Sequence, residues 1–553
     1  MKPHWIAGVI LSLSLTAFSA ETAPSVLSSF EGLSTAEKYA TEALQGIVNR
    51  PGPRLLVAHS GPGGKNGYTY TWADIYRDRY GLRFETVKGF PALFAHFGDR
   101  VKGVAVYDPT IDGTRCIALT LAGTDDLLPV DAEMLANHAV LLGGLPVRYD
   151  LRGLFTNSLD VYEWALKEVM PRCNRRMAHT PAGPDVDGTH VGAGPYRGFD
   201  WTVAHRGFIF NLGLEYQDTA SFDHVVQGNK AQSDLYRRIL AALESPALFF
   251  GYGEFEMDWF TLLGQSGHYY LHWGDNLSFH EQVLAHITPI RQRPHAAAAL
   301  DPHKYTVCFV TSEGDTMKGP LPFFSGSWFD PRRGEVPMNW AIHPLMARFP
   351  AMLENYYQTA TSNDCFVAMQ VYDLAMPNLS QFAPLLAEDL RQSDLSVICG
   401  SFGAPSRAAN REAFCRGLHP LGVFEALFHK APREGSQVVL PDGTPVVSSG
   451  SQLAYWHRLL GGWSAPWQEM ARDTAQRPKV ITALTDEIAR IAAAHPPPFV
   501  VLVYSDLHGY DRHCSLHADV AAALDPHRFQ TARLDDAFAL LRKSGLVPDG
   551  KRK

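Results

Sequence analysis

The sequence predicts an α/β protein in which a multi-part N-terminal α/β region precedes a C-terminal (β/α) barrel-like domain. Short apolar runs alternate with helical repeats along the 553 residues, an order typical of parallel sheets covered on both faces. Hydrophobic residues make up 46% of the chain and charged residues 19%, so the chain can bury a large core and lacks the composition of a disordered protein. At about 100–200 residues per domain, the length leaves room for two to four domains.

The first residues are typical of a secretory signal peptide, which we assign to residues 1–20. Lys2 supplies a positive charge, residues 6–17 form an apolar stretch, and Ser19 and Ala20 are the small residues of a cleavage site. This stretch of about 12 residues is shorter than the roughly 20 that span a bilayer. We therefore expect an exported protein, periplasmic or extracellular, with no stable membrane span after cleavage.

Charge and cysteine content argue against several classes of function. The chain has 49 Lys and Arg against 57 Asp and Glu, a net charge of -8, so there is no basic excess to bind nucleic acid. The 7 cysteines include no C-x-x-C pair, which disfavours a zinc knuckle or a thioredoxin-like motif. Cys308, Cys365 and Cys399 lie in apolar runs and are expected to be buried thiols. We expect no cofactor and no metal.

The N-terminal α/β region is assigned to residues 24–175. Ser34 and Glu37 form a capping box before a helical repeat that Pro51 ends, and a strand follows at 55–58. Further periodic runs predict strands at 103–107, 117–121 and 140–142 and a helix at 159–170.

A stretch rich in Gly, Pro and Asp marks residues 176–204 as a linker or long loop. A second α/β subdomain, residues 205–298, follows, with predicted strands at 208–212 and 247–250 and a helix at 235–244. The C-terminal barrel-like domain covers residues 299–546. Its predicted strands are 305–310, 365–372, 395–399, 438–440 and 499–504, and its predicted helices are 345–360, 382–390 and 480–494.

Acidic residues follow three of the C-terminal strands. Glu313 and Asp315 come after the first of them, Asp373 after the second, and Asp506 and His508 after the last. Because ligands bind at the carboxyl ends of parallel strands, these residues are candidates for proton transfer or metal binding. The alternative is that each acid caps a helix or forms a turn.

A second acidic group, Glu254 and Glu256, lies beside aromatic residues. Carboxylates accept hydrogen bonds from sugar hydroxyls while aromatic rings stack on sugar faces, so this group is a candidate for substrate binding. Equally, Phe255 and Trp259 are four residues apart and can lie in the core on a helix whose acids face water.

These motifs resemble those of the GxGYxYP family of putative glycoside hydrolases, which are exported bacterial proteins. Residues 44–50, L-Q-G-I-V-N-R, are similar to the family's opening segment, and 311–316, T-S-E-G-D-T, stand where the family shows S-D-G-D-N. Residues 337–340 and 363–364 are similar to segments that follow. The naming motif itself differs, because residues 368–377 read A-M-Q-V-Y-D-L-A-M-P.

The resemblance implies a carbohydrate substrate and hydrolysis by paired carboxylates, which lie about 5–5.5 Å apart for retention or about 6.5–9.5 Å apart for inversion. We interpret Glu313 as the general acid and Asp315 as the base or nucleophile, because residues two apart on a strand share a face. Asp364 and Asp373 are further catalytic candidates. The residues expected to bind substrate are Trp340, Tyr372, Trp328, Glu254, Glu256, Asp506 and His508.

Two other functions stay open at this point. The altered naming motif is compatible with a non-catalytic exported carbohydrate-binding protein. A metal-dependent carbohydrate hydrolase or deacetylase, using Asp506, His508 or the acids around Glu313, is the other alternative. The sequence indicates neither the glycan nor the oligomeric state.

Overall fold

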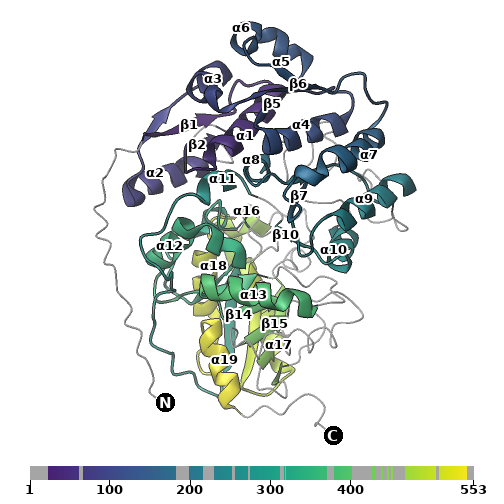
Figure 1. The fold of residues 1–553 in the computed structure, drawn as a ribbon. Coiled ribbons are helices and arrows are strands. Elements are labelled where there is room, and N and C mark those ends of the chain that lie inside the picture. Colours follow the sequence, from purple (N-terminus) through teal and green to yellow (C-terminus); the bar gives the residue numbers. More distant parts are fainter. Residues whose placement is uncertain are drawn as a thin grey trace, which may run out of the picture.

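The computed structural model describes residues 23–544, except 61–66, 182–197, 216–228, 252–255, 272–273, 312–316, 318, 370–378, 401–425, 430–436, 440–444, 448–449, 453–466 and 506–509. The predicted signal peptide therefore lies outside the described residues. In Figure 1 the N-terminal elements, purple to teal, lie above the green and yellow C-terminal elements. Among the described residues, no helix has the length and apolar character needed to cross a membrane.

Three small parallel sheets build the N-terminal region. Their strand orders are β2–β1–β3, β5–β4–β6 and β10–β9–β7–β8, and each neighbouring pair is parallel. The strands are β1 Ser25–Ser29, β2 Leu55–Ala58, β3 Phe84–Thr86, β4 Gly103–Val106, β5 Leu127–Val130, β6 Val147–Asp150, β7 Met177–Thr180, β8 Phe208–Ile209, β9 Leu248–Gly251 and β10 Tyr269–Leu271.

Helices connect these strands, as parallel pairing requires. Helix α1, Thr35–Asn49, begins at the predicted capping box, in which Ser34 Oγ accepts the Glu37 N–H and the Glu37 carboxylate accepts the Ser34 N–H. The other N-terminal helices are α2 Tyr68–Tyr80, α3 Phe90–Phe97, α4 Asp112–Asp125, α5 Ala132–Asn137, α6 Ala139–Leu142, α7 Ser158–Glu168, α8 Phe199–Ala204, α9 Lys230–Ala242, α10 Glu256–Gln265 and α11 Leu277–His280.

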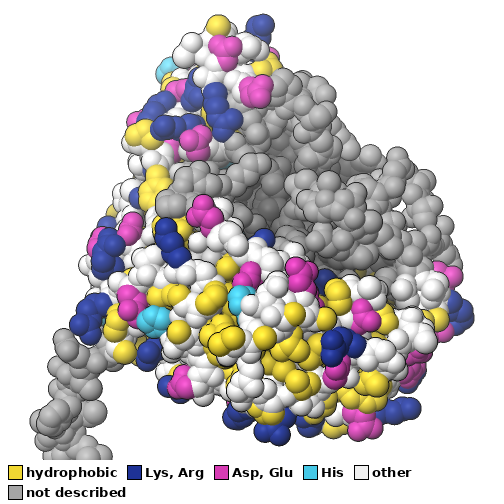
Figure 2. Space-filling view, turned by 90° about the horizontal axis from the view of Figure 1, so that it is seen from above, with side chains coloured by type: hydrophobic (Ala, Val, Ile, Leu, Met, Phe, Trp, Pro, Cys, Tyr) yellow, Lys and Arg dark blue, Asp and Glu magenta, His cyan; other side chains and the backbone are white. Residues whose placement is uncertain are grey.

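Two predicted strands are wrong, because a short apolar run does not distinguish a buried strand from a helix. Residues 117–121 lie in α4, which is buried along most of its length. Residues 140–142 form α6, where Leu142 is buried but Val140 is fully exposed. Figure 2 views the molecule from the end that carries α5 and α6 in Figure 1, and hydrophobic side chains gather on that face.

Both ends of the predicted 176–204 linker are folded. Strand β7 pairs with β8 and β9, and helix α8 carries the buried residues Phe199 and Trp201. The second subdomain therefore includes residues on the N-terminal side of 205. The Gly- and Pro-rich centre of the stretch, 182–197, lies outside the described residues.

One large sheet organises the C-terminal region, in the order β16–β17–β15–β14–β13–β12–β11–β19–β18. All its described pairs are parallel except β16–β17. Its strands are β11 Tyr305–Thr311, β12 Met338–Ile342, β13 Asp364–Met369, β14 Val397–Gly400, β15 Ala426–His429, β16 Gln437–Val439, β17 Pro445–Val447, β18 Gly450–Gln452, β19 Phe499–Ser505 and β20 Phe529–Thr531.

This sheet curls into a half-barrel, whereas the sequence led us to expect a barrel-like closure. Among the described strands, β16 and β18 are its two ends, and no ladder joins them. Strand β11 also branches, because β20 pairs with its first residues and β12 with its last. The antiparallel strand β16 ends the parallel series at one edge.

Helices bury both faces of this sheet. Along β11, Val307 and Phe309 face a large core shared with α12 Pro350–Thr359, α13 Leu379–Ser393, α17 Arg477–Ala493 and α18 His513–Ala523. The alternate residues, Cys308 and Val310, face a second core that α19, Leu534–Lys543, covers. Cys308 and Cys365 are buried free thiols, as expected. Helix α16, Trp467–Arg472, packs against α17.

Helix α2 of the N-terminal region packs into the core of the C-terminal region. The Trp72 ring stacks on Phe323 with centroids 4.7 Å apart, and its Nε1 donates to the Leu321 carbonyl at 2.8 Å. Tyr80 donates its hydroxyl to the Ala351 carbonyl at 2.7 Å. The two regions therefore share a continuous aromatic core.

Candidate functional site

The carboxyl ends of the C-terminal strands lie along one edge of the half-barrel, which we call the carboxyl edge. Thr311, at the end of β11, pairs with Ser505 at the end of β19, and Met369, at the end of β13, pairs with Cys399 in β14. The candidates that follow these strand ends, Glu313, Asp315, Tyr372, Asp373, Asp506 and His508, lie outside the described residues. Their roles stay predictions.

Asp364 lies at the opposite, amino edge of the sheet. It is the first residue of β13, which places it about 17 Å from the carboxyl end of that strand. Its carboxylate is buried, forms an ion pair with Arg333, and accepts hydrogen bonds from Trp340 Nε1 at 2.7 Å and the Thr361 N–H at 2.7 Å. Each of these contacts with the described residues is internal, so the structure gives Asp364 a structural role at the amino edge, and its catalytic role is not supported by its position.

Trp328 and Trp340 are core residues and do not form a stacking platform for sugar. Trp340 has no exposed surface and Trp328 is 4% exposed, and their rings lie 5.1 Å apart. The Arg333 guanidinium lies 4.0 Å from the centroid of the Trp328 ring, a cation–π contact. With Asp364, these residues form a buried structural cluster.

The second acidic group is described only in part. Glu254 and Phe255 lie outside the described residues, and Glu256 is the first residue of α10. Trp259, one turn further along α10, is fully buried and donates Nε1 to the Tyr236 hydroxyl at 2.6 Å. The expectation that Trp259 lies in the core is confirmed, and the role of Glu254 and Glu256 in substrate binding stays a prediction.

The L-Q-G-I-V-N-R segment ties α1 to its neighbours. Gln45 Nε2 donates to Asn276 Oδ1 at 2.6 Å, and Asn49 Nδ2 donates to Ser278 Oγ at 2.9 Å. A Cβ on Gly46 would lie 2.3 Å from the Asp200 carbonyl oxygen in α8, so glycine permits the close approach of the two helices. This segment therefore has a structural role, which is to hold α1 against α8 and residues 276–278.

A cluster of buried carboxylates, missed by the sequence analysis, surrounds His59 at the end of β2. Its Nε2 lies 3.8 Å from Glu42 Oε1 and 3.9 Å from Asp275 Oδ1. Tyr68 donates its hydroxyl to Asp275 Oδ2. An imidazole between two carboxylates can hold and transfer protons. The sequence did contain a signal for this cluster, because the polar residues Glu42, Gln45 and Asn49 recur three and four residues apart and therefore lie on one face of α1.

Asp200 extends this cluster and has a perturbed acidity. Its side chain is buried, and Oδ2 accepts the Ser278 N–H at 2.9 Å. Burial, assisted by the negative charge of Asp275, raises the pKa of Asp200 from 3.8 to about 6, against the effect of that hydrogen bond. Asp200 therefore titrates closer to neutrality than an ordinary aspartate.

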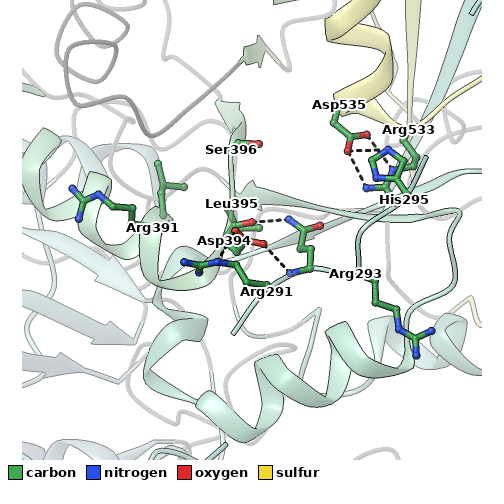
Figure 3. A pocket seen from close by; sticks show the side chains of 11 residues that line it. Arg291, Arg293, His295, Arg391, Asp394, Leu395, Ser396, Arg533 and Asp535 are labelled. Atoms are coloured by element: carbon green, nitrogen blue, oxygen red, sulfur yellow. Dashed lines mark hydrogen bonds and ion pairs between the residues drawn. The ribbon is translucent and has the colours of Figure 1, made fainter. Parts of the chain in front are cut away.

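A cavity of about 390 Å³ opens at the amino edge of the half-barrel. Asp394, Leu395 and Ser396, which lead into β14, line one side (Figure 3), and Asp394 Oδ2 accepts the Gln292 N–H at 2.8 Å. Arg533, Asp535 and His295 gather at its other end. Arg533 Nη1 donates to the Asp364 carbonyl at 2.6 Å, which places this end beside the start of β13.

This chain matches two models of one protein family in sequence and a solved structure in fold. Residues 303–399 match the "GxGYxYP putative glycoside hydrolase C-terminal domain", and residues 101–173 match the "GxGYxYP_N second domain". A crystal structure described as a putative hydrolase from Bacteroides thetaiotaomicron VPI-5482 is 19% identical, with 94% of this chain and 95% of that chain covered and a TM-score of 0.73. The two chains share a fold. No curated protein matches the sequence.

Proposed function

Because the chain belongs to the GxGYxYP family, we propose that it is an exported glycoside hydrolase that cleaves a polysaccharide or other glycan with paired carboxylates at the carboxyl edge. Export rests on residues 1–20, whose charge and apolar stretch are typical of a signal peptide. The substrate class rests on the family.

The strand register of the half-barrel is the observation that carries the proposal. Strands β11 and β19 are neighbours and stay paired up to Thr311 and Ser505. Glu313 follows Thr311 by two residues, and Asp506 follows Ser505 directly. Neighbouring strands lie about 4.8 Å apart, so both acidic segments start from adjacent points of one edge.

A third acidic segment starts from the same edge. Strand β12 alone separates β13 from β11, and Asp373 follows the last residue of β13, Met369, by four residues. Strands separated by one neighbour lie about 10 Å apart, a span that two inward-reaching carboxylates can reduce to the separation needed for hydrolysis. Asp373 is thus an alternative partner for Glu313.

In the proposed reaction, Glu313 donates a proton to the glycosidic oxygen as its bond to the anomeric carbon breaks. With retention, Asp315 attacks that carbon, and Glu313 then removes a proton from the water that releases the sugar. With inversion, Asp315 instead removes the proton from the attacking water. Tyr372, Asp506 and His508 are assigned to substrate binding.

The test is a glycan-panel hydrolysis assay on the protein without residues 1–20, with release of reducing ends as the readout. Glu313→Gln should lower kcat by about 10²–10⁴-fold, because general acid catalysis contributes that much. Glu335→Gln is the matched control, since this carboxylate is half exposed and pairs with Arg332 on the surface.

Three outcomes decide the matter. Loss of turnover in Glu313→Gln alone supports the proposal, whereas full activity of a folded Glu313→Gln removes that residue from the mechanism. A wild-type protein that binds a glycan in calorimetry but hydrolyses none would show the non-catalytic carbohydrate-binding protein instead. Circular dichroism of each variant verifies that the fold is intact.

A further inference from the structure

Two distant segments bring three metal-ligand side chains together beside the cavity at the amino edge. His295 lies in the segment that precedes β11, while Asp535 and Asp536 belong to the first turn of α19. His295 Nε2 is 3.5 Å from Asp535 Oδ2 and 3.5 Å from Asp536 Oδ1. One donor atom from each residue lies within 4.8 Å of the other two.

These distances fit a shared cation better than direct hydrogen bonds. A nitrogen–oxygen hydrogen bond is about 2.7–3.2 Å long, and His295 Nε2 is buried without forming one among the described residues. In a tetrahedral site with metal–ligand distances of about 2.0–2.2 Å, neighbouring ligand atoms lie about 3.4 Å apart. Both measured separations match that edge length.

The surrounding groups hold the two carboxylates in a ligating orientation. The buried Arg533 guanidinium makes a bidentate interaction with the Asp535 carboxylate: Nε donates to Oδ1 at 3.1 Å and Nη2 donates to Oδ2 at 2.9 Å. The Ala298 N–H donates to Asp536 Oδ1 at 3.1 Å. Metal-ligating carboxylates carry such outer hydrogen bonds, which fix their orientation.

We propose that His295, Asp535 and Asp536 bind a divalent transition-metal cation, Zn²⁺ or Mn²⁺, at the amino edge of the half-barrel. One imidazole nitrogen and two carboxylate oxygens suit these ions. His295 and Asp535 also line the 390 Å³ cavity, which leaves room for water as the fourth ligand (Figure 3).

The ion would cross-link the segment before β11 to the first turn of α19. This role is separate from the proposed hydrolysis, because the cavity lies beside Asp364 at the start of β13 and the acidic segments follow the opposite ends of the strands. Metal removal should therefore lower stability first. It should leave the assignment of Glu313 unaffected.

The experiment uses tag-free protein that has been treated with a chelator and dialysed. Titration calorimetry with ZnCl₂ and with MnCl₂ should show one saturable site per chain, and the ion should raise the thermal unfolding midpoint. Co²⁺ should give the visible absorption of a tetrahedral site. His295→Ala and Asp536→Asn should each weaken binding by at least the roughly 10–100-fold that loss of an outer-shell partner costs, because each changes a direct ligand.

His303→Ala is the matched control, because His303 is an exposed histidine eight residues along the same segment. It should bind the ion like the wild type. Asp536→Asn retains an oxygen acceptor for the Ala298 N–H, so it keeps the test decisive if His295→Ala does not fold. The proposal is overturned if the chelated protein takes up no ion or if both variants bind it with wild-type affinity. A thermal unfolding midpoint that does not change when the metal is added would overturn it equally.

Discussion

Replacing Arg333 by Met should destabilise the protein far more than the same change at its neighbour Arg332. The Asp364 carboxylate has no exposed surface, and Arg333 is its cationic partner with a side chain only 15% exposed. Without the guanidinium, the carboxylate stays buried, and its donors within the described part of the chain are the Trp340 and Thr361 N–H groups. Removing one partner of a buried ion pair costs about 3–5 kcal/mol.

Arg332 is the internal control because it lies on the surface. Its side chain is 36% exposed and contacts Glu335 and Asp519, which are themselves partly exposed. Surface ion pairs contribute about 0.2–1 kcal/mol each, so losing two of them in Arg332→Met should cost about 0.4–2 kcal/mol. The two adjacent substitutions should therefore differ by at least about 1 kcal/mol, and by about 3 kcal/mol between the centres of the two ranges.

Urea unfolding followed by tryptophan fluorescence measures this difference, since Trp328 and Trp340 lie in the cluster. The double variant Arg333→Met, Asp364→Asn should regain much of the lost free energy of unfolding, because no unpaired charge stays buried and the amide oxygen can still accept a hydrogen bond from Trp340 or Thr361. Equal losses for Arg332→Met and Arg333→Met would refute the reasoning. So would a stable Asp364→Asn variant that has lost turnover on an identified glycan.

Two further predictions concern Gly46 in α1 and Asp200 in α8. Gly46→Ala should lower the thermal midpoint in scanning calorimetry by an amount that corresponds to about 1–3 kcal/mol, since the new Cβ would lie 2.3 Å from the Asp200 carbonyl oxygen. Gly144→Ala is the control, because no atom of the described residues lies within 4 Å of its Cβ position. Equal midpoints for the two variants would contradict the prediction. Because the pKa of Asp200 is raised to about 6 in the folded state, its stabilising contribution is complete below about pH 4 and is lost, by about 3 kcal/mol, as the pH rises through 6. Asp200→Asn should flatten this decline in urea unfolding between pH 4 and 7, and an unchanged slope would show that another group causes it.

Local signals in the sequence predicted individual elements well. The capping box at Ser34 marks the start of α1, and the apolar run at 55–58 is strand β2. Capping depends on contacts within four residues, and turn residues act equally locally. The predicted runs at 305–310 and 499–504 likewise correspond to β11 and β19.

Apolar runs without periodicity did not indicate whether a segment is a helix or a strand. Helix α4 is buried on nearly all sides, so its residues show no polar face that would distinguish it from a strand. The ends of the predicted linker at 176–204 carry short elements, β7 and α8, which pair and pack with segments distant in sequence. Contacts with such distant segments cannot be predicted from the neighbouring residues in the sequence.

The sequence alone determined the alternation of strands and helices, the parallel class of the sheets and the acids that follow strand ends, because each depends on residues near one another in the chain. Only the tertiary structure decided which polar residues meet. It buried Asp364 with Arg333, enclosed His59 between Glu42 and Asp275, and brought His295 to Asp535. The members of each group are distant in sequence, so their contacts follow from strand register and helix packing, which local composition does not encode.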